Sequence, residues 1–173
     1  LRTEIPEVVL CKPTIFKDER GYFYEVFKKE IFEKFIGYAV SFCQDNEAKS
    51  SKGVLRGLHY QLAPFAQSKL VRVLKGKVLD VVVDIRKGSA TFGKSVVVEL
   101  SEENKYQLFV PQGFAHGYIT LSDEAIFCYK VDNYYNKESE RGIIYNDETL
   151  NIDWKFPSKN LIISEKDKLQ PTL

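Results

Sequence analysis

The sequence predicts an all-β protein built as a sandwich or barrel. Short runs of apolar and β-branched residues recur at regular spacing from residue 69 to residue 131. Turns rich in Gly, Pro, Asn and Asp separate these runs, a rhythm typical of sandwiches and barrels. With 173 residues and no internal repeat or linker, the chain is expected to form a single domain, residues 1–173.

The first half of the chain contains the only segment with convincing helical spacing. Apolar residues recur at helical intervals between residues 28 and 36, and Gly37 is placed to end that helix. The turn at 18–21 separates two expected strands, and Pro13 interrupts the first strand or holds it at an edge. The strands expected in this half cover residues 7–16, 22–27 and 40–43.

The second half is read almost entirely as strands. A loop is expected at 62–68, and Lys75-Gly76-Lys77 is a hairpin signal. Between residues 78 and 85 the aliphatic side chains alternate with Asp80 and Asp84, which places the two carboxylates on the opposite face. The expected strands cover residues 56–61, 69–74, 78–85, 95–100, 106–110, 118–121 and 125–131.

The composition excludes several classes of function. The 25 basic and 24 acidic residues nearly balance, so there is no electrostatic footprint for nucleic acid or a membrane surface. No apolar run approaches the roughly 20 residues that cross a bilayer. The cysteines, Cys11, Cys43 and Cys128, form no CxxC pair, and we expect buried, reduced thiols in a cytoplasmic protein.

One stretch, residues 52–61, combines a potential base with nearby cations. His59 follows Arg56 by three residues and precedes Lys69 by ten. A histidine beside cations suits proton abstraction next to a carbonyl, because a cation stabilises the enolate oxygen that forms. In an unbroken strand Arg56 and His59 point to opposite faces, but a bulge at Gly57 brings them together. The alternative is an ordinary strand with an exposed arginine and a hydrogen-bonded histidine.

Two further side chains are candidates for a site inside a barrel. Pro111, Gly113 and His116 match the PxGxxH spacing of the second motif of cupin jelly rolls, although a core histidine after a turn has the same pattern. The HxH pair of a metal-binding cupin is absent after His59, so we expect no metal. Tyr129 lies in an apolar strand, where it can donate a proton or simply pack.

Longer motifs then make the family resemblance specific. The chain contains RGLHYQ followed by Lys69, VVDIRKGSATFG, VPQGFAHGY, YKVDNYYNKESERGIIYNDETLNIDW and a terminal SEKD. From about residue 14 to residue 167 it resembles dTDP-4-dehydrorhamnose 3,5-epimerases. The resemblance implies a cupin-like jelly-roll barrel with a few short peripheral helices, which forms a homodimer and uses neither metal nor organic cofactor.

The same resemblance implies a reaction and a set of roles. The substrate is dTDP-4-dehydro-6-deoxy-D-glucose, whose ketone acidifies the hydrogens at carbons 3 and 5, so that both centres are inverted through enolates. His59 resembles the family's general base and Asp167 the carboxylate that orients it. Lys69 resembles the cation that stabilises the enolate, and Tyr129 the proton donor on the opposite face. Tyr135 resembles the second tyrosine, which controls protonation.

Substrate-binding positions carry over from the family as well. Arg20 and Glu25 resemble residues supplied near the dimer interface, and arginines at 20 and 56 suit a diphosphate. Without the family, each of these residues is read as a solvated surface group. The run after Asn46 departs from many members, which have a histidine or another polar residue after QDN where this chain continues with Glu47, Ala48 and Lys49. The other binding positions are Gln44, Asn46, Arg56, His116 and Glu140.

Two other functions compete with the expected one. Epimerases that invert one carbon, or that act on another nucleotide-linked 4-keto sugar, use the same base and donor. A non-catalytic cupin that binds a sugar nucleotide belongs to a different class. Because the base, the cation and the donor are all present, the sequence favours the 3,5-epimerase.

Overall fold

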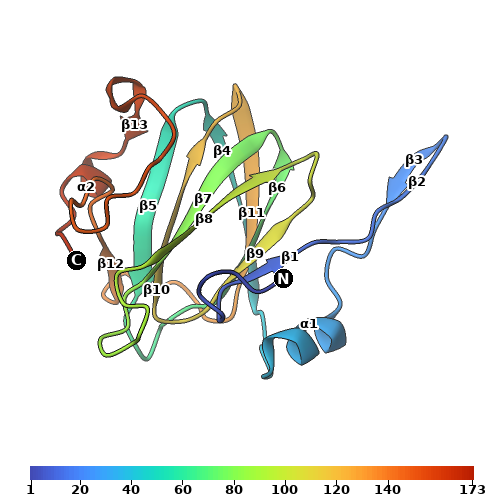
Figure 1. Ribbon diagram of the computed structural model, residues 1–173, viewed down its shortest axis with the longest axis horizontal. Helices are drawn as coiled ribbons and strands as arrows, with labels where there is room; N and C mark the ends of the chain where they lie inside the picture. The colour runs from blue at the N-terminus through green and yellow to red at the C-terminus, as the bar shows by residue number, and fades with distance from the viewer.

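The computed structural model describes residues 1–173 and consists mainly of two antiparallel sheets packed face to face (Figure 1). The first sheet has the strand order β1 (Val9–Cys11), β9 (Gln107–Val110), β6 (Lys69–Lys75), β11 (Glu124–Val131) and β4 (Gln44–Ser51). The second has the order β12 (Glu140–Gly142), β5 (Val54–Gln61), β10 (Phe114–Thr120), β7 (Lys77–Asp84) and β8 (Ser95–Ser101). This is the predicted jelly-roll barrel.

The main core lies between the two sheets. Val71 and Phe127 of the first sheet pack with Val78, Val82 and Tyr118 of the second, and all are nearly inaccessible to solvent. The predicted alternation in β7 is confirmed, since Leu79, Val81 and Val83 face a separate cluster on the outer side of the second sheet. Both faces of β7 are therefore covered, and Asp80 and Asp84 are completely buried.

The C-terminal tail covers the outer face of the second sheet. Ile143, Leu150 and Trp154 pack there, and the tail continues through η1 (Ser158–Asn160) to β13 (Ile162–Ile163), which pairs parallel to β5. The last helix, α2 (Glu165–Lys168), then lies beside β5 (Figure 1). In this way the end of the chain reaches a strand more than 100 residues earlier.

The predicted helix is confirmed as α1 (Lys29–Ile36). It ends at Gly37, whose φ of 93° is left-handed and whose N–H bonds to the carbonyl of Glu33 at 2.8 Å. Phe32 and Ile36 are its buried residues, and they pack on the outer face of the first sheet. Neither α1 nor α2 is long and apolar enough to cross a lipid bilayer.

Three strand predictions in the first half are wrong in detail. Of the expected strand 7–16, only Val9–Cys11 pairs with the barrel, and Phe16 instead begins the separate strand β2 (Phe16–Asp18), because Pro13 between them has no N–H for the ladder. The segment 22–27 forms only β3 (Gly21–Phe23), which pairs with β2 in a hairpin exposed at all six positions. We call this hairpin the arm; it projects from the barrel in Figure 1. Residues 40–43 are not a strand; β4 begins at Gln44.

The cysteine prediction is only partly right. All three thiols are free, but Cys43 is exposed, while Cys11 and Cys128 are half-buried. Cys43 precedes β4, where its sulfur lies 3.5 Å from the carbonyl of Val131 at the end of the neighbouring strand. A sequence neighbourhood rich in apolar residues therefore did not predict burial here.

The predicted bulge in β5 is confirmed at Gly57. In the pairing with β10, His59 lies opposite His116 while Arg56 lies opposite Tyr118, so β5 contains one residue more than its partner between these two pairs. Gly57 has a φ of 130°, and a Cβ there would lie 2.5 Å from the Cα of Gly117. Only glycine satisfies both the backbone angle and the close approach of the strands.

We expect Gly57→Ala to lower the free energy of unfolding by about 2–4 kcal/mol, since it combines an unfavourable φ with overpacking against β10. Gly21→Ala is a matched control, because Gly21 has the same φ of 130° but nothing within 4 Å of its Cβ position. This control is expected to lower the free energy of unfolding by only about 1 kcal/mol. Urea denaturation measures both; equal losses would show that the contact with Gly117 is unimportant.

Candidate active site

The predicted catalytic residues line one pocket of about 620 Å³ that opens between the two sheets. Strand β5 contributes Arg56 and His59, and the first sheet contributes Lys69 from β6 and Tyr129 from β11. The remaining lining residues come from the core and from the tail; they include His116, Tyr118, Phe127, Ile163, Ser164, Lys166 and Asp167. The bulge at Gly57 is the reason that Arg56 and His59 share this face.

His59 and Asp167 form a close pair. Nε2 of His59 lies 2.6 Å from Oδ1 of Asp167; the imidazole is 30% exposed and the carboxylate only 5%. Burial alone raises the pKa of Asp167, but hydrogen bonds from His59 and from the N–H of Gly57 outweigh it and hold that pKa below its usual range. Asp167 thus stays ionised, orients the ring and leaves the other nitrogen of His59 as a base.

Asp167 is placed by the local structure of the tail. Ser164 is the N-cap of α2, and its hydroxyl accepts a hydrogen bond from the backbone N–H of Asp167 at 3.1 Å. Pairing of β13 with β5 sets the position of the segment just before this cap. The SEKD motif therefore both starts α2 and supplies the carboxylate that bonds to His59.

Lys69 and Tyr129 lie in the sheet opposite His59, and neither side chain has a hydrogen-bond or ion-pair partner in the protein. Burial lowers the pKa of Lys69 to about 8, although Asp80 and Glu140 act against this. Burial also raises the pKa of Tyr129, with Arg56 opposing, so its phenol keeps its proton at neutral pH. The pocket thus holds a cation and a proton donor, both free to contact a substrate.

Arg56 and His116 line the same wall as His59. Nε of Arg56 donates to the hydroxyl of Ser50 at 3.1 Å, and no carboxylate pairs with its guanidinium. His116 is buried and bonded to Asp80. A pocket with unpaired cationic side chains is well suited to a phosphorylated ligand.

A smaller hollow of about 300 Å³ adjoins the pocket and shares His59, Lys69 and Tyr129 with it. The amide of Gln44 donates to Asn46 at 2.7 Å, and the phenol of Tyr135 donates to Glu140 at 2.8 Å. Burial raises the pKa of Glu140, but hydrogen bonds from Lys166 and Tyr135 bring it below its ordinary value. These four predicted binding residues therefore extend one continuous site.

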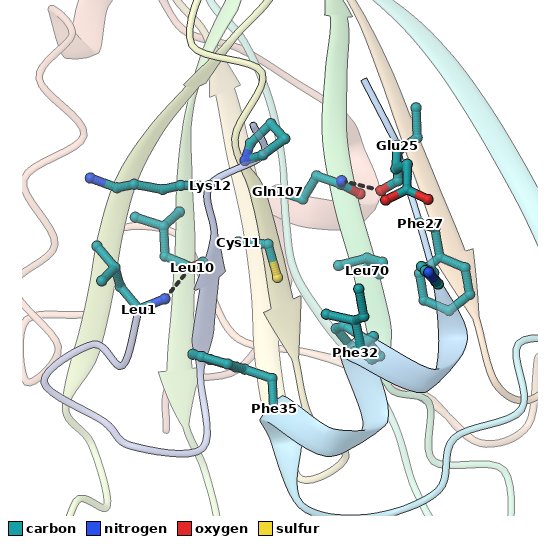
Figure 2. Close-up of a pocket in the computed structure, with 14 residues that line it drawn as sticks. Leu1, Leu10, Cys11, Lys12, Glu25, Phe27, Phe32, Phe35, Leu70 and Gln107 are labelled. Atoms are coloured by element: carbon teal, nitrogen blue, oxygen red, sulfur yellow. Dashed lines mark hydrogen bonds between the residues drawn. The ribbon is translucent and has the colours of Figure 1, made fainter. Parts of the chain in front are cut away.

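Two predicted residues, Arg20 and Glu25, are not brought to this site. Arg20 lies at the turn of the arm, where its side chain is 86% exposed and pairs with Asp18. Glu25 lies at the base of the arm, in a different and mostly apolar pocket of about 250 Å³ between β1, α1 and β6 (Figure 2). The amide of Gln107 donates to the carbonyl of Val26 there at 2.6 Å.

The structure adds residues to the site that the sequence analysis did not single out. Lys166 pairs with Glu140 at 2.6 Å and lines the main pocket. Lys166 directly precedes Asp167 in the SEKD motif, so this motif was the sequence signal that could have identified it. Asp80 also had a signal, since it is acidic within an otherwise aliphatic strand. Ser50 and Tyr118 had none, because their importance depends on contacts with other strands.

No group of three or more His, Cys, Asp or Glu side chains lies close enough together to hold a metal ion. Each histidine of the pocket is instead paired with a single aspartate.

Comparison with known proteins agrees with this geometry. A family model described as dTDP-4-dehydrorhamnose 3,5-epimerase matches residues 2–173. The chain belongs to this family. The dTDP-4-dehydrorhamnose 3,5-epimerase of Shigella flexneri is 57% identical over 167 residues, which are 96% of this chain and 91% of the relative.

Solved structures of the family share the fold closely. The epimerase from Elizabethkingia anophelis superposes with a TM-score of 0.96 at 52% identity, over 99% of this chain and 94% of that one. The dTDP-6-deoxy-D-glucose-3,5-epimerase from Legionella pneumophila, in complex with dTDP-4-keto-L-rhamnose, gives 0.95 at 49% identity, over 99% and 90%.

We predict that kcat/KM falls about tenfold per pH unit above pH 8, because Lys69 of the free enzyme loses its charge above its pKa of about 8. Glu140→Gln should move this alkaline limb to lower pH, because Glu140 raises the pKa of Lys69. Glu124→Gln is the control: Glu124 pairs with Lys49 and Lys75 on the surface and should leave the profile unchanged. If Glu140→Gln left the alkaline limb unchanged, that limb would belong to a group other than Lys69.

Proposed function

We propose that this protein epimerises dTDP-4-dehydro-6-deoxy-D-glucose at carbons 3 and 5, giving dTDP-4-dehydro-L-rhamnose. The observation that carries the proposal is the His59–Asp167 pair, which faces Lys69 and Tyr129 across one pocket. The dTDP-4-keto-L-rhamnose bound to the Legionella pneumophila relative supports a dTDP-linked keto sugar as the ligand of this pocket.

The chemistry follows from the placement of these side chains. The substrate's ketone at carbon 4 acidifies the hydrogens on both adjacent carbons, and His59 removes one of them. The negative charge moves to the ketone oxygen, where the ammonium of Lys69 stabilises it. Tyr129 then returns a proton to the same carbon. Proton exchange with solvent restores the neutral imidazole of His59 and the phenol of Tyr129 before the second centre reacts. Because β5 and β11 belong to opposite sheets, base and donor approach a sugar held between them from opposite faces, which inverts the centre.

Solvent exchange tests this proposal directly. Incubation with dTDP-4-dehydro-6-deoxy-D-glucose in heavy water should give product with deuterium at carbons 3 and 5 and with both centres inverted. Deuterium and inversion at one carbon alone would make the protein a single-centre epimerase. Tight binding without any exchange would leave a non-catalytic binding protein.

Two variants separate the roles of base and donor. His59→Ala should abolish turnover while dTDP binds nearly as before, because it removes a group that acts in the transition state. Tyr129→Phe should slow net inversion more than the first loss of substrate hydrogen. If both steps slow equally in Tyr129→Phe, the phenol is not the donor.

We further propose that the active form is a homodimer. The arm has three large exposed aromatic side chains, Phe16, Tyr22 and Phe23, and none of them joins a hydrophobic core cluster of the barrel. Tyr22 does contact the barrel through Lys105, whose Nζ lies 4.6 Å from the centre of its ring. Arg20, expected to bind substrate, lies on this arm away from its own pocket. An arm that reaches the pocket of a second copy accounts for both observations. We also propose a cytoplasmic location, since the cysteines are free thiols.

Mixing inactive subunits tests the shared site. In a dimer of one His59→Ala subunit and one Arg20→Ala subunit, one pocket has both residues intact if Arg20 comes from the partner. Activity should therefore return when the two weak variants are mixed and allowed to exchange subunits. No recovery, in a mixture shown by mass spectrometry to contain mixed dimers, would place Arg20 outside the partner's site.

A further inference from the structure

Gln61, the last residue of β5, is a buried amide that bonds to the backbone of the loops beside the site. Only 8% of it is exposed, and it lines the smaller hollow. Its Nε2 donates to the carbonyl of Phe65 at 2.6 Å and to that of Tyr134 at 3.1 Å. Its Oε1 accepts from the N–H of Asn136 at 2.7 Å. Both amide hydrogens and the amide oxygen are therefore used within the protein.

Two of these bonds lie on either side of Tyr135 in the chain. The carbonyl of Tyr134 and the N–H of Asn136 belong to the two residues that flank it. Neither the N–H nor the carbonyl of Tyr135 is itself hydrogen-bonded to the protein. An amide suits this position, because the side chain has to donate to one flanking residue and accept from the other. Gln61 thus fixes the backbone on both sides of Tyr135.

The phenol of Tyr135 is fixed as well. It donates to Oε2 of Glu140 at 2.8 Å, and the same oxygen lies 2.6 Å from Nζ of Lys166. Glu140 lies directly opposite Gln61 in the pairing of β12 with β5. One cross-strand pair therefore holds both ends of Tyr135, the backbone through Gln61 and the hydroxyl through Glu140.

Tyr135 is nevertheless open to a ligand. It is 58% exposed and lines the hollow together with His59, Lys69 and Tyr129. An aromatic ring that is already ordered loses little conformational entropy when a ligand packs on it. A loop that has to become ordered during binding gives a weaker complex, because that entropy is lost at the same moment.

We propose that Gln61 is a positioning residue that holds the ring of Tyr135 in place as a preformed contact for the substrate. The ring packs either on the nucleotide or on the keto sugar, since both present a flat or apolar face to an aromatic side chain. This inference rests on the proposed function only in taking a dTDP-linked sugar as the ligand.

Gln61→Met tests this role, because it removes the three hydrogen bonds but keeps a side chain of similar length without charge. It should weaken binding of the ligand that contacts the ring about 5- to 10-fold. Lower affinity for dTDP alone, measured by calorimetry, assigns the ring to the nucleotide. Unchanged affinity for dTDP with a higher KM, or with a changed ratio of deuterium at carbons 3 and 5, assigns the ring to the sugar.

Two controls separate positioning from a general loss of stability. In a Tyr135→Ala background, Gln61→Met should have no further effect on binding, because the two residues act as a unit. Asn104→Leu is the matched control. The amide of Asn104 also makes three hydrogen bonds to backbone groups, but it lines neither the pocket nor the hollow. Its loss should lower stability without changing affinity, KM or the deuterium ratio.

Hydrogen exchange in the unmodified protein tests the arrangement without any variant. The amide of Asn136 should exchange slowly, while the amide of Lys137, which has no hydrogen-bond partner, should exchange rapidly. Binding of dTDP or of the complete sugar nucleotide should slow exchange at Asn136 further, because the ligand packs on the neighbouring ring.

Each of several results would overturn the proposal. They are rapid exchange at Asn136, exchange there that neither ligand slows, a folded Gln61→Met protein with unaltered binding and products, an equal loss of affinity in Asn104→Leu, and an effect of Gln61→Met that persists beside Tyr135→Ala. The exchange measurements decide the outcome if Gln61→Met does not fold. Failure of the proposed function has a different signature, namely no deuterium uptake from heavy water with the unmodified protein.

Discussion

The hydrogen bond between His59 and Asp167 is the interaction on which the site depends, because it joins the barrel to the end of the chain. The tail has to cross the outer face of the second sheet, pair β13 with β5 and begin α2 at Ser164 before Asp167 reaches the imidazole. Much of the packing of residues 143–163 on the barrel therefore also supports the orientation of the His59 imidazole.

A second constraint is the close approach of β5 and β10 at Gly57 and Gly117. The extra residue in β5 turns Arg56 and His59 to the same face, and the register places His59 opposite His116. A strand of uniform alternation sends one of these side chains out of the pocket. Backbone geometry at a glycine thus decides which side chains share the site.

The two-sheet architecture also provides what inversion requires. His59 on β5 and Tyr129 on β11 line the pocket from opposite sheets, while Lys69 lies in the same sheet as Tyr129 and lines the same pocket. Burial lowers the pKa of Lys69 to about 8. Burial also raises the pKa of Tyr129, so its phenol keeps its proton at neutral pH. The same low-dielectric interior therefore prepares two side chains for different roles.

From the sequence alone, strand rhythm indicated the barrel, helical spacing and Gly37 indicated α1, and the motifs indicated the family and the chemistry of His59, Lys69 and Tyr129. These signals are local, since alternation, caps and motif residues depend on neighbours in the chain. The sequence did not indicate β4, whose polar residues have little preference for strands and are held by pairing with β11. It did not assign a partner to Asp80, and it did not show that the arm leaves Arg20 away from its own pocket. Those features depend on contacts between residues distant in sequence, so the tertiary structure decided them.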